Sequence, residues 1–237
     1  MKRNNYGYKV DYSAVANNAD SVNTSVPFSV VEAYKSIRTN LMYLLSQTKN
    51  KAFVVSSSLP GEGKSTCAIN LAIAFSQLGS RVLLIDADLR KPSIYRKMRL
   101  QNIKGLSSVL VGFCEFDEAV CKIDDNLDVL LSGPIPPNPS ELVASENMTK
   151  LLETLSEQYD YILIDTPPVN VVSDAVLLSQ KTGGVLFVVQ DRKTTHDEFK
   201  KAVNLLKFAE VRLLGVALNG SSEKSAKYPS KAQIYQY

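Results

Sequence analysis

The segment Ser56-Ser57-Ser58-Leu59-Pro60-Gly61-Glu62-Gly63-Lys64-Ser65-Thr66 decides the fold of this chain. It follows the apolar run Ala52-Phe53-Val54-Val55 and precedes a helical pattern that continues to about Leu78. The order strand, glycine-containing loop, helix is typical of loops whose backbone N–H groups surround phosphate groups. Glycine is favoured in such a loop because a side chain would hold the backbone away from the phosphates.

We therefore expect this loop to bind a nucleotide triphosphate through Pro60, Gly61, Glu62, Gly63, Lys64, Ser65 and Thr66. Lys64 would reach the β- and γ-phosphates, and the Ser65 hydroxyl suits Mg²⁺, a hard cation that prefers oxygen ligands. The motif is not strict, because Ser58 stands at its opening position. A chance Gly-Lys-Ser in a surface loop is the alternative, and the flanking strand and helix argue against it.

Composition limits the classes of function. With 237 residues and 45% hydrophobic residues, the chain is long enough for one α/β domain with tails. A net charge of +3 gives no support for a specific nucleic-acid partner. Three cysteines without metal-ligand spacing indicate a reducing compartment, and one histidine excludes a histidine-based triad. No apolar run approaches a membrane span, so the sequence predicts a cytoplasmic protein.

Apolar strands alternate with helical patterns along the chain. Strands are predicted at about 52–57, 81–85, 127–131, 161–165, 184–189 and 213–219. Helices are predicted at about 29–45, 64–78, 105–111, 117–121, 146–158, 173–180 and 195–208. This alternation predicts an α/β fold of the P-loop NTPase type, with a mostly parallel sheet covered by helices on both faces. Residues 1–26 would be a flexible arm, 27–220 the folded domain and 221–237 a flexible tail.

Carboxylates follow two of the predicted strands. Asp86 and Asp88 end one strand, and Asp165 ends another. Ligands of an open parallel sheet bind at the carboxyl ends of its strands, so these acids are expected to converge near Lys64 and Ser65. Asp165 and Asp86 would be ligands of Mg²⁺, and Asp88 would accept the proton of an incoming hydroxyl. Helix capping is the alternative role for Asp86 and Asp88.

Two further regions with basic residues also bear on function. Arg90 follows the acids, and its guanidinium would hold phosphate or carboxylate in a fork; a salt bridge to an acidic neighbour is equally open. In the predicted helix 29–45, Glu32, Lys35 and Arg38 share one face. From spacing alone, this face is expected to be solvated and to contain a Glu–Lys pair.

Together, four segments resemble the bacterial tyrosine kinases that use Walker motifs. They are residues 57–66, residues 83–90 with Asp-x-Asp-x-Arg, residues 162–168, and residues 32–40. The loop 133–142, with Pro-Pro-Asn-Pro-Ser-Glu-Leu, is similar to that family as well.

The resemblance implies a protein-tyrosine kinase that uses ATP and Mg²⁺. Lys64 would bind the phosphates, Ser65 and Asp86 would hold Mg²⁺, and Asp165 would act through water. Asp88 would be the base, and Arg90 completes the expected catalytic set. Glu32, Lys35 and Arg38 would contact a neighbouring subunit in a ring-shaped homo-oligomer; Lys35 stands where the family usually has Arg.

The family also implies acceptors and partners. Tyr228, Tyr235 and Tyr237 would be autophosphorylated between subunits, although tail tyrosines without a role are the alternative. A separate transmembrane activator would recruit the kinase to the membrane, and a cognate phosphotyrosine phosphatase would reverse its action on tyrosine-bearing protein substrates. The usual setting is capsule or exopolysaccharide production.

Two other classes of function compete with this reading. A partition or cell-division-positioning ATPase shares the broad fold, but its loop usually carries an extra lysine near the start, where this chain has Ser57, Ser58 and Leu59. A non-enzymatic nucleotide-binding scaffold would have no use for Asp88 or for the tail tyrosines.

Overall fold

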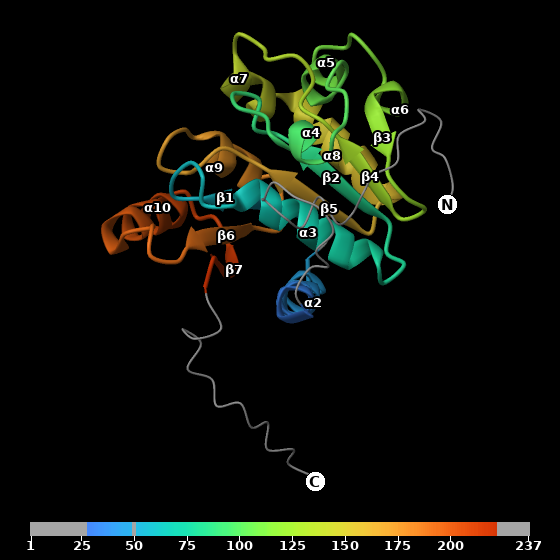
Figure 1. The fold of residues 1–237 in the computed structure, drawn as a ribbon. Helices are drawn as coiled ribbons and strands as arrows, with labels where there is room; N and C mark the ends of the chain where they lie inside the picture. The colour runs from blue at the N-terminus through green and yellow to red at the C-terminus, as the bar shows by residue number, and fades with distance from the viewer. Residues whose placement is uncertain (1–27, 49–50, 222–237) are drawn as a thin grey trace.

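One twisted sheet organises the molecule (Figure 1). The structure is a computed structural model and describes residues 28–48 and 51–221. Within this part of the chain the sheet has seven strands, in the order β3-β4-β2-β5-β1-β6-β7. They are β1 (Ala52–Ser57), β2 (Val82–Asp86), β3 (Val120–Lys122), β4 (Leu127–Leu130), β5 (Tyr161–Asp165), β6 (Val185–Gln190) and β7 (Leu213–Asn219).

All strand pairs except one are parallel. The exception is β3, which pairs antiparallel with β4 at one edge of the sheet. The sequence prediction of a helix at 117–121 was partly wrong, because a helix ends at Ala119 and residues 120–122 form β3. The conformation of residues 120–122 is set by pairing with β4, and the local sequence contains no signal for that pairing.

Helices cover both faces of the sheet, as predicted. One face carries α2 (Phe28–Leu45), α3 (Lys64–Ser76) and α4 (Ile94–Lys97). The other carries α5 (Leu106–Leu110), α6 (Phe116–Ala119), α7 (Pro139–Ala144), α8 (Glu146–Gln158), α9 (Asp174–Ser179) and α10 (His196–Phe208). Since both faces are covered, every residue of β1, β2 and β5 is buried, which explains their continuous apolar sequences.

Helix α2 differs from its prediction at one residue. Glu32 and Lys35 form the expected ion pair on the helix surface, at 2.7 Å. Arg38, by contrast, is buried and donates a hydrogen bond from Nη1 to the carbonyl of Ala74 in α3, at 2.6 Å. The expectation of a uniformly solvated face was therefore wrong for Arg38, which ties α2 to α3 within its own subunit.

The described residues contain no helix that is long and apolar enough to cross a membrane. Among the described residues, Cys67, Cys114 and Cys121 are free thiols. The predicted arm at 1–26 and the three tail tyrosines lie outside the described residues.

Candidate active site

The glycine loop connects β1 to α3 at the carboxyl edge of the sheet. Gly61 and Gly63 both have positive φ, at 80° and 94°. Gly63 is the residue before α3, and no side chain caps the helix there. The first backbone N–H groups of α3 thus have no partner within the helix, and a phosphate is the ligand that they and the helix dipole attract.

Gly63 is also required for a reason that the sequence did not reveal. A Cβ atom at this position would overlap the side-chain amide of Asn219, at the end of β7. That amide donates a hydrogen bond to the carbonyl of Glu62, at 3.0 Å. The last strand of the sheet therefore supports the glycine loop directly.

Lys64 gathers the acids of the site. Its Nζ atom lies 2.9 Å from Oδ2 of Asp88 and 3.4 Å from Oδ1 of Asp165. Burial alone would lower the pKa of Lys64, but the charges of Asp165 and Asp88 outweigh it and raise that pKa above its ordinary value. The lysine is therefore a buried cation held by carboxylates, on the side of the loop that faces the β2 and β5 ends.

Asp165 and Asp86 lie side by side behind Lys64. They are paired in register on the parallel strands β5 and β2, and both are fully buried. Burial, and then the charge of Asp165, raises the pKa of Asp86 to about 7. Burial likewise raises the pKa of Asp165. Oδ2 of Asp165 has no hydrogen-bond partner, so a buried oxygen ligand is available next to Ser65.

Asp86 has a capping role in the structure. Its Oδ2 atom accepts hydrogen bonds from the backbone N–H groups of Ser93 and Ile94, at the start of α4, and Oδ1 accepts one from the N–H of Asp88. The capping alternative is therefore present in the structure, alongside the position of Asp86 next to Asp165. Asp86 does not line the open pocket.

Asp88 does reach that pocket. The pocket has a volume of about 360 Å³ and lies between the loop 60–66, the segment 88–97 and the segment 167–172. One carboxylate oxygen of Asp88 accepts from Lys64, and the other accepts from the backbone N–H of Lys91. Asp88 thus stands on the pocket wall next to Lys64, Ser65 and Thr66, where a phosphate and an incoming hydroxyl would meet.

Arg90 also lines the pocket, and it is held by an ion pair. Its Nε atom lies 3.1 Å from Oδ2 of Asp174, a buried residue at the start of α9. Its Nη2 atom donates to Oγ of Ser140, which itself donates to Asp174. The salt-bridge alternative is thus realised, and the bridge fixes the guanidinium at the edge of the pocket. Asp174 and Ser140 were not singled out in the sequence.

Glu62 faces away from the pocket. Its side chain is 1% exposed; it accepts hydrogen bonds from Leu59 N–H, at 2.9 Å, and from the Thr194 hydroxyl. Any contact between Glu62 and a phosphate therefore comes from the backbone. Lys193 reinforces this support by donating to the carbonyl of Gly61, at 3.0 Å. No motif pointed to Lys193, Thr194 or Asn219, although Asn219 ends a predicted strand and so belongs to the expected edge.

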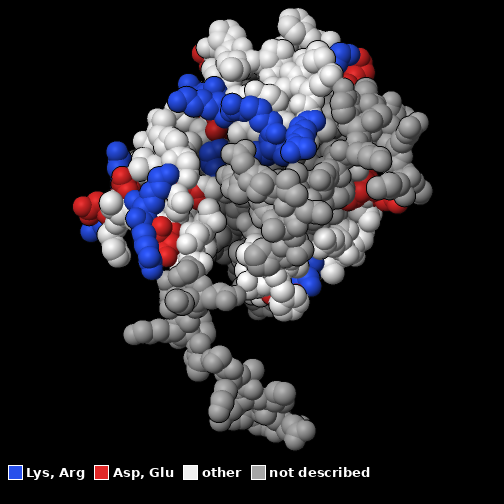
Figure 2. Space-filling view, in the orientation of Figure 1, with Lys and Arg blue, Asp and Glu red and all other residues white. Residues whose placement is uncertain are grey.

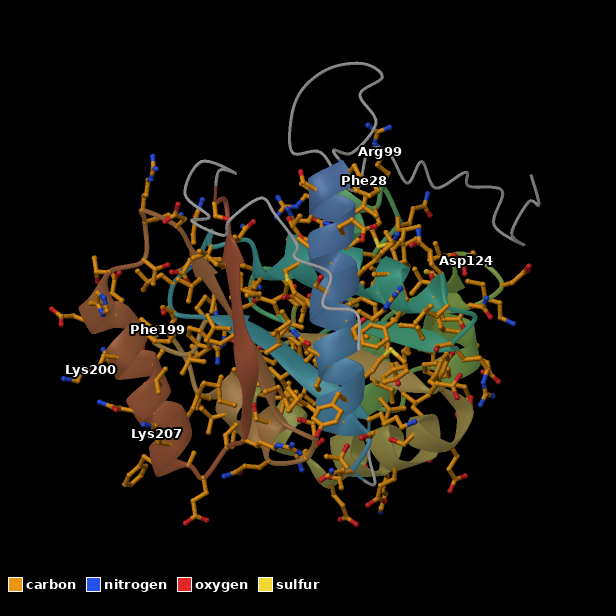
Figure 3. The ribbon with its side chains drawn as sticks, turned by 90° about the horizontal axis from the view of Figure 1, so that it is seen from below. Phe28, Arg99, Asp124, Phe199, Lys200 and Lys207 are labelled. Carbon is orange, nitrogen blue, oxygen red and sulfur yellow. The ribbon has the colours of Figure 1, made fainter. Side chains whose placement is uncertain are left out.

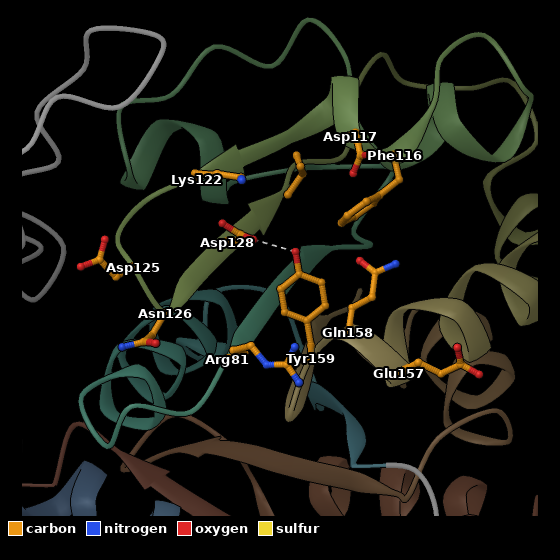
Figure 4. A pocket seen from close by; sticks show the side chains of 11 residues that line it. Arg81, Phe116, Asp117, Lys122, Asp125, Asn126, Asp128, Glu157, Gln158 and Tyr159 are labelled. Carbon is orange, nitrogen blue, oxygen red and sulfur yellow. Dashed lines mark hydrogen bonds between the residues drawn. The ribbon is translucent and has the colours of Figure 1, made fainter.

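A second hollow lies at the opposite edge of the sheet (Figure 4). Its volume is about 430 Å³, and it is lined by residues of α6, β3 and β4 and by residues that precede β2, β4 and β5. Inside it, Tyr159 donates a hydrogen bond to Asp128, at 2.7 Å. Because parallel strands start here rather than end, this hollow is remote from the glycine loop and takes no part in the site.

The residues present fit a nucleotide with Mg²⁺. No three His, Cys, Asp or Glu side chains are grouped as metal ligands anywhere in the described ranges, so the side chains alone form no metal site. The oxygen donors at the loop are Ser65 and the unpartnered carboxylate oxygen of Asp165. A hard cation held by two protein oxygens plus phosphate oxygens is the usual arrangement for Mg²⁺.

Comparisons with known proteins agree with this geometry. Residues 48–237 match the family described as "ParA: NUBPL iron-transfer P-loop NTPase". The Bacillus subtilis protein named tyrosine-protein kinase YwqD is 42% identical over 199 residues, covering 83% of this chain and 84% of that protein. The Staphylococcus aureus protein named putative tyrosine-protein kinase CapB is 35% identical over 192 residues, covering 81% of this chain and 84% of that protein.

A solved structure extends the similarity to three dimensions. The kinase domain of the Escherichia coli tyrosine kinase ETK has a TM-score of 0.79 and 32% identity, covering 92% of this chain and 87% of that domain. The fold and the glycine loop define a P-loop NTPase. Within that fold, the chain belongs to the bacterial tyrosine-protein kinases. The kinase prediction is thereby confirmed over the partition-ATPase alternative.

Proposed function

We propose that this tyrosine kinase transfers the terminal phosphoryl group of ATP to tyrosine hydroxyls with the help of Mg²⁺. The acceptors are tyrosines of other proteins and Tyr228, Tyr235 and Tyr237 of a neighbouring subunit. The observation that carries the proposal is the pair formed by Lys64 and Asp88, 2.9 Å apart on the pocket wall beside the glycine loop. In this pair, Lys64 supplies a cation that can bind phosphate, and Asp88 supplies a carboxylate that can accept the proton of a hydroxyl.

Each residue has a defined task in this proposal. The N–H groups of the loop and of the first turn of α3 bind the phosphates, and Lys64 neutralises their charge. Ser65 and Asp165 would hold Mg²⁺, with Asp165 offering the free oxygen. Asp86 would be an outer ligand, because both of its carboxylate oxygens accept backbone N–H groups. When bound, Mg²⁺ neutralises and aligns the β- and γ-phosphate oxygens. Asp88 orients the tyrosine hydroxyl and accepts its proton as the phosphoryl group moves.

Arg90, which also lines the pocket, would support the phosphates through its positive charge. Its ion pair with Asp174 and its hydrogen bond to Ser140 limit the positions that the guanidinium can take. A preorganised cation stabilises developing charge without reorganising during the reaction. Its task is therefore electrostatic.

Partners follow from membership of the family rather than from the site. We propose a homo-oligomeric ring in which Glu32, Lys35 and Arg38 contribute contacts. A separate transmembrane protein activates the kinase and brings it to the membrane. A phosphotyrosine phosphatase removes the phosphate from the modified tyrosines. Regulation of capsule or exopolysaccharide production is the proposed setting. Arg38 would serve the ring through its hold on α3, because its guanidinium already bonds within the subunit.

The decisive experiment is phosphotyrosine detection on the purified chain after incubation with ATP and Mg²⁺. Wild type should become labelled on tyrosine, whereas Asp88→Asn should bind ATP and remain unlabelled. Wild-type protein that hydrolyses ATP without any phosphotyrosine would contradict the proposal and favour the ATPase alternative.

A further inference from the structure

The segment 90–99, which reads Arg-Lys-Pro-Ser-Ile-Tyr-Arg-Lys-Met-Arg, has an unusual charge. It contains five cations, namely Arg90, Lys91, Arg96, Lys97 and Arg99, and no acidic residue. It runs from the end of the Asp-x-Asp-x-Arg motif through α4. We call these five side chains the basic strip.

The basic strip borders the nucleotide pocket. Arg90, Lys91 and Lys97 line the pocket itself, and Lys97 donates to the hydroxyl of Thr66, at 3.1 Å. Arg96 and Arg99 continue the strip outward along α4 and its end, and both are exposed. Figure 2 shows Lys and Arg side chains running across this face over the region of α4. One end of the strip is thus inside the site, and the other is on the open surface.

Most of this charge is uncompensated. Among the described residues, only Arg90 of the five forms an ion pair, with Asp174. Arg96 bonds to the carbonyl of Pro92 and lies over the ring of Tyr95, at 5.5 Å, so its contacts are neutral. Exposed cations without acidic partners leave a positive potential at the entrance of the site, and such a potential attracts and orients anionic partners.

We propose that the basic strip binds acidic residues that flank the acceptor tyrosine in protein substrates. The inference rests on the proposed function, because an acceptor tyrosine must enter the pocket beside Asp88. The chain on either side of that tyrosine then passes over the rim that the strip forms. A peptide is favoured over an anionic membrane because the strip continues into the pocket, where a flat surface cannot follow.

The chain's own acceptors contrast with such a substrate. Residues 222–237 contain Lys224, Lys227 and Lys231 but only one acid, Glu223. Like charges disfavour this segment at the basic strip. The strip therefore discriminates in favour of acidic foreign substrates and gives no assistance to the tail.

The test uses two peptides that each contain one tyrosine, one flanked by glutamates and one copied from residues 224–237 with a single tyrosine retained. The variant R96E/R99E changes only exposed positions outside the pocket. The matched control is K200E/K207E, which makes the same change in net charge on α10, well separated from Arg99 (Figure 3). R96Q/R99Q repeats the test with neutral side chains, in case the reversed charges impair folding.

For wild type and the control, KM should be lower for the acidic peptide than for the tail peptide. In R96E/R99E, KM for the acidic peptide should rise about tenfold or more, because two favourable ion pairs become repulsive. KM for ATP should stay at the wild-type value, and KM for the tail peptide should stay or fall. High salt should reduce the wild-type preference, since exposed charges are screened.

Two results would overturn the inference. One is an unchanged KM for the acidic peptide in both strip variants. The other is loss of binding to phosphatidylserine vesicles in R96E/R99E with peptide KM values unchanged, which would assign the strip to a membrane instead. Failure of wild type to phosphorylate any tyrosine would refute the proposed function itself, and it is distinguished from these results by the absence of label on both peptides.

Discussion

The Nζ atom of Lys64 lies 2.9 Å from Oδ2 of Asp88, although 24 positions separate the two residues in the chain. The contact joins the first residue of α3 to the loop that follows β2. In this arrangement the lysine is neutralised by acids. A bound triphosphate would take over part of that charge balance and free Asp88 to receive a tyrosine hydroxyl.

Asp88→Asn should reduce phosphoryl transfer by roughly 100-fold or more, because a general base typically contributes a factor of this size. ATP affinity should change little, since the side chain that faces the phosphates is Lys64. Transfer is measured with radiolabelled ATP, and affinity by calorimetry. A parallel loss of ATP binding would show that Asp88 holds the nucleotide or its metal rather than the proton.

Lys64→Met should abolish labelling and also lower the melting temperature. The substitution leaves buried Asp165 without the cation 3.4 Å away, and removing one partner of a buried ion pair costs about 3–5 kcal/mol. Thermal unfolding is recorded first, so that labelling is compared below the transition of the variant. Wild-type labelling by a folded Lys64→Met protein would remove Lys64 from the site.

Thr194→Val should weaken ATP binding from outside the pocket. It leaves the buried Oε1 of Glu62 without the donor that now holds it, at a cost of about 1–3 kcal/mol for an unsatisfied buried group. The glycine loop loses part of its support, so KM for ATP should rise more than kcat falls. Thr154→Val on α8, whose hydroxyl donates to the carbonyl of Lys150 in its own helix, is the matched control. Equal KM values in the two variants would show that the loop needs no such support.

If the proposed ring forms, Glu32→Ala combined with Lys35→Ala should dissociate it and leave the fold intact, because the ion pair is half-exposed and worth at most about 1 kcal/mol. Arg38→Ala should instead lower the free energy of unfolding by roughly 1–3 kcal/mol, because the backbone carbonyl of Ala74 loses the buried hydrogen bond that Arg38 donates to it. Light scattering and thermal unfolding separate the two effects. An intact assembly in Glu32→Ala/Lys35→Ala would exclude these residues from the ring contact.

Much of the fold could be predicted because local signals agreed with tertiary structure. The apolar runs at 52–57 and 161–165 are buried strands, and the glycine loop stands between a strand and a helix as the pattern required. The short β3 strand was missed because three residues at a sheet edge take their conformation from β4. Arg38 was misjudged because its acceptor in α3 is 36 residues away.

The site could be predicted only in part. The convergence of the acids could be predicted, because parallel strands end at the same edge of a sheet and these acids follow the strands in the sequence. The structure brings Asp88 and Asp165 to Lys64. The partners that hold the site could not be predicted, because they come from distant segments. Asp174 lies 84 positions from Arg90, and Asn219 lies 157 positions from Glu62.

Mass-spectrometric mapping of phosphosites on the full chain, after incubation with ATP and Mg²⁺, tests the central claim most directly. We expect phosphate on Tyr228, Tyr235 and Tyr237 of the wild type. The Asp88→Asn variant, incubated by itself under the same conditions, should carry none. When the three tyrosines are replaced by Phe, most of the autophosphate should disappear while a foreign tyrosine peptide is still phosphorylated. ATP consumption by the wild type with no phosphate on any tyrosine would contradict the account.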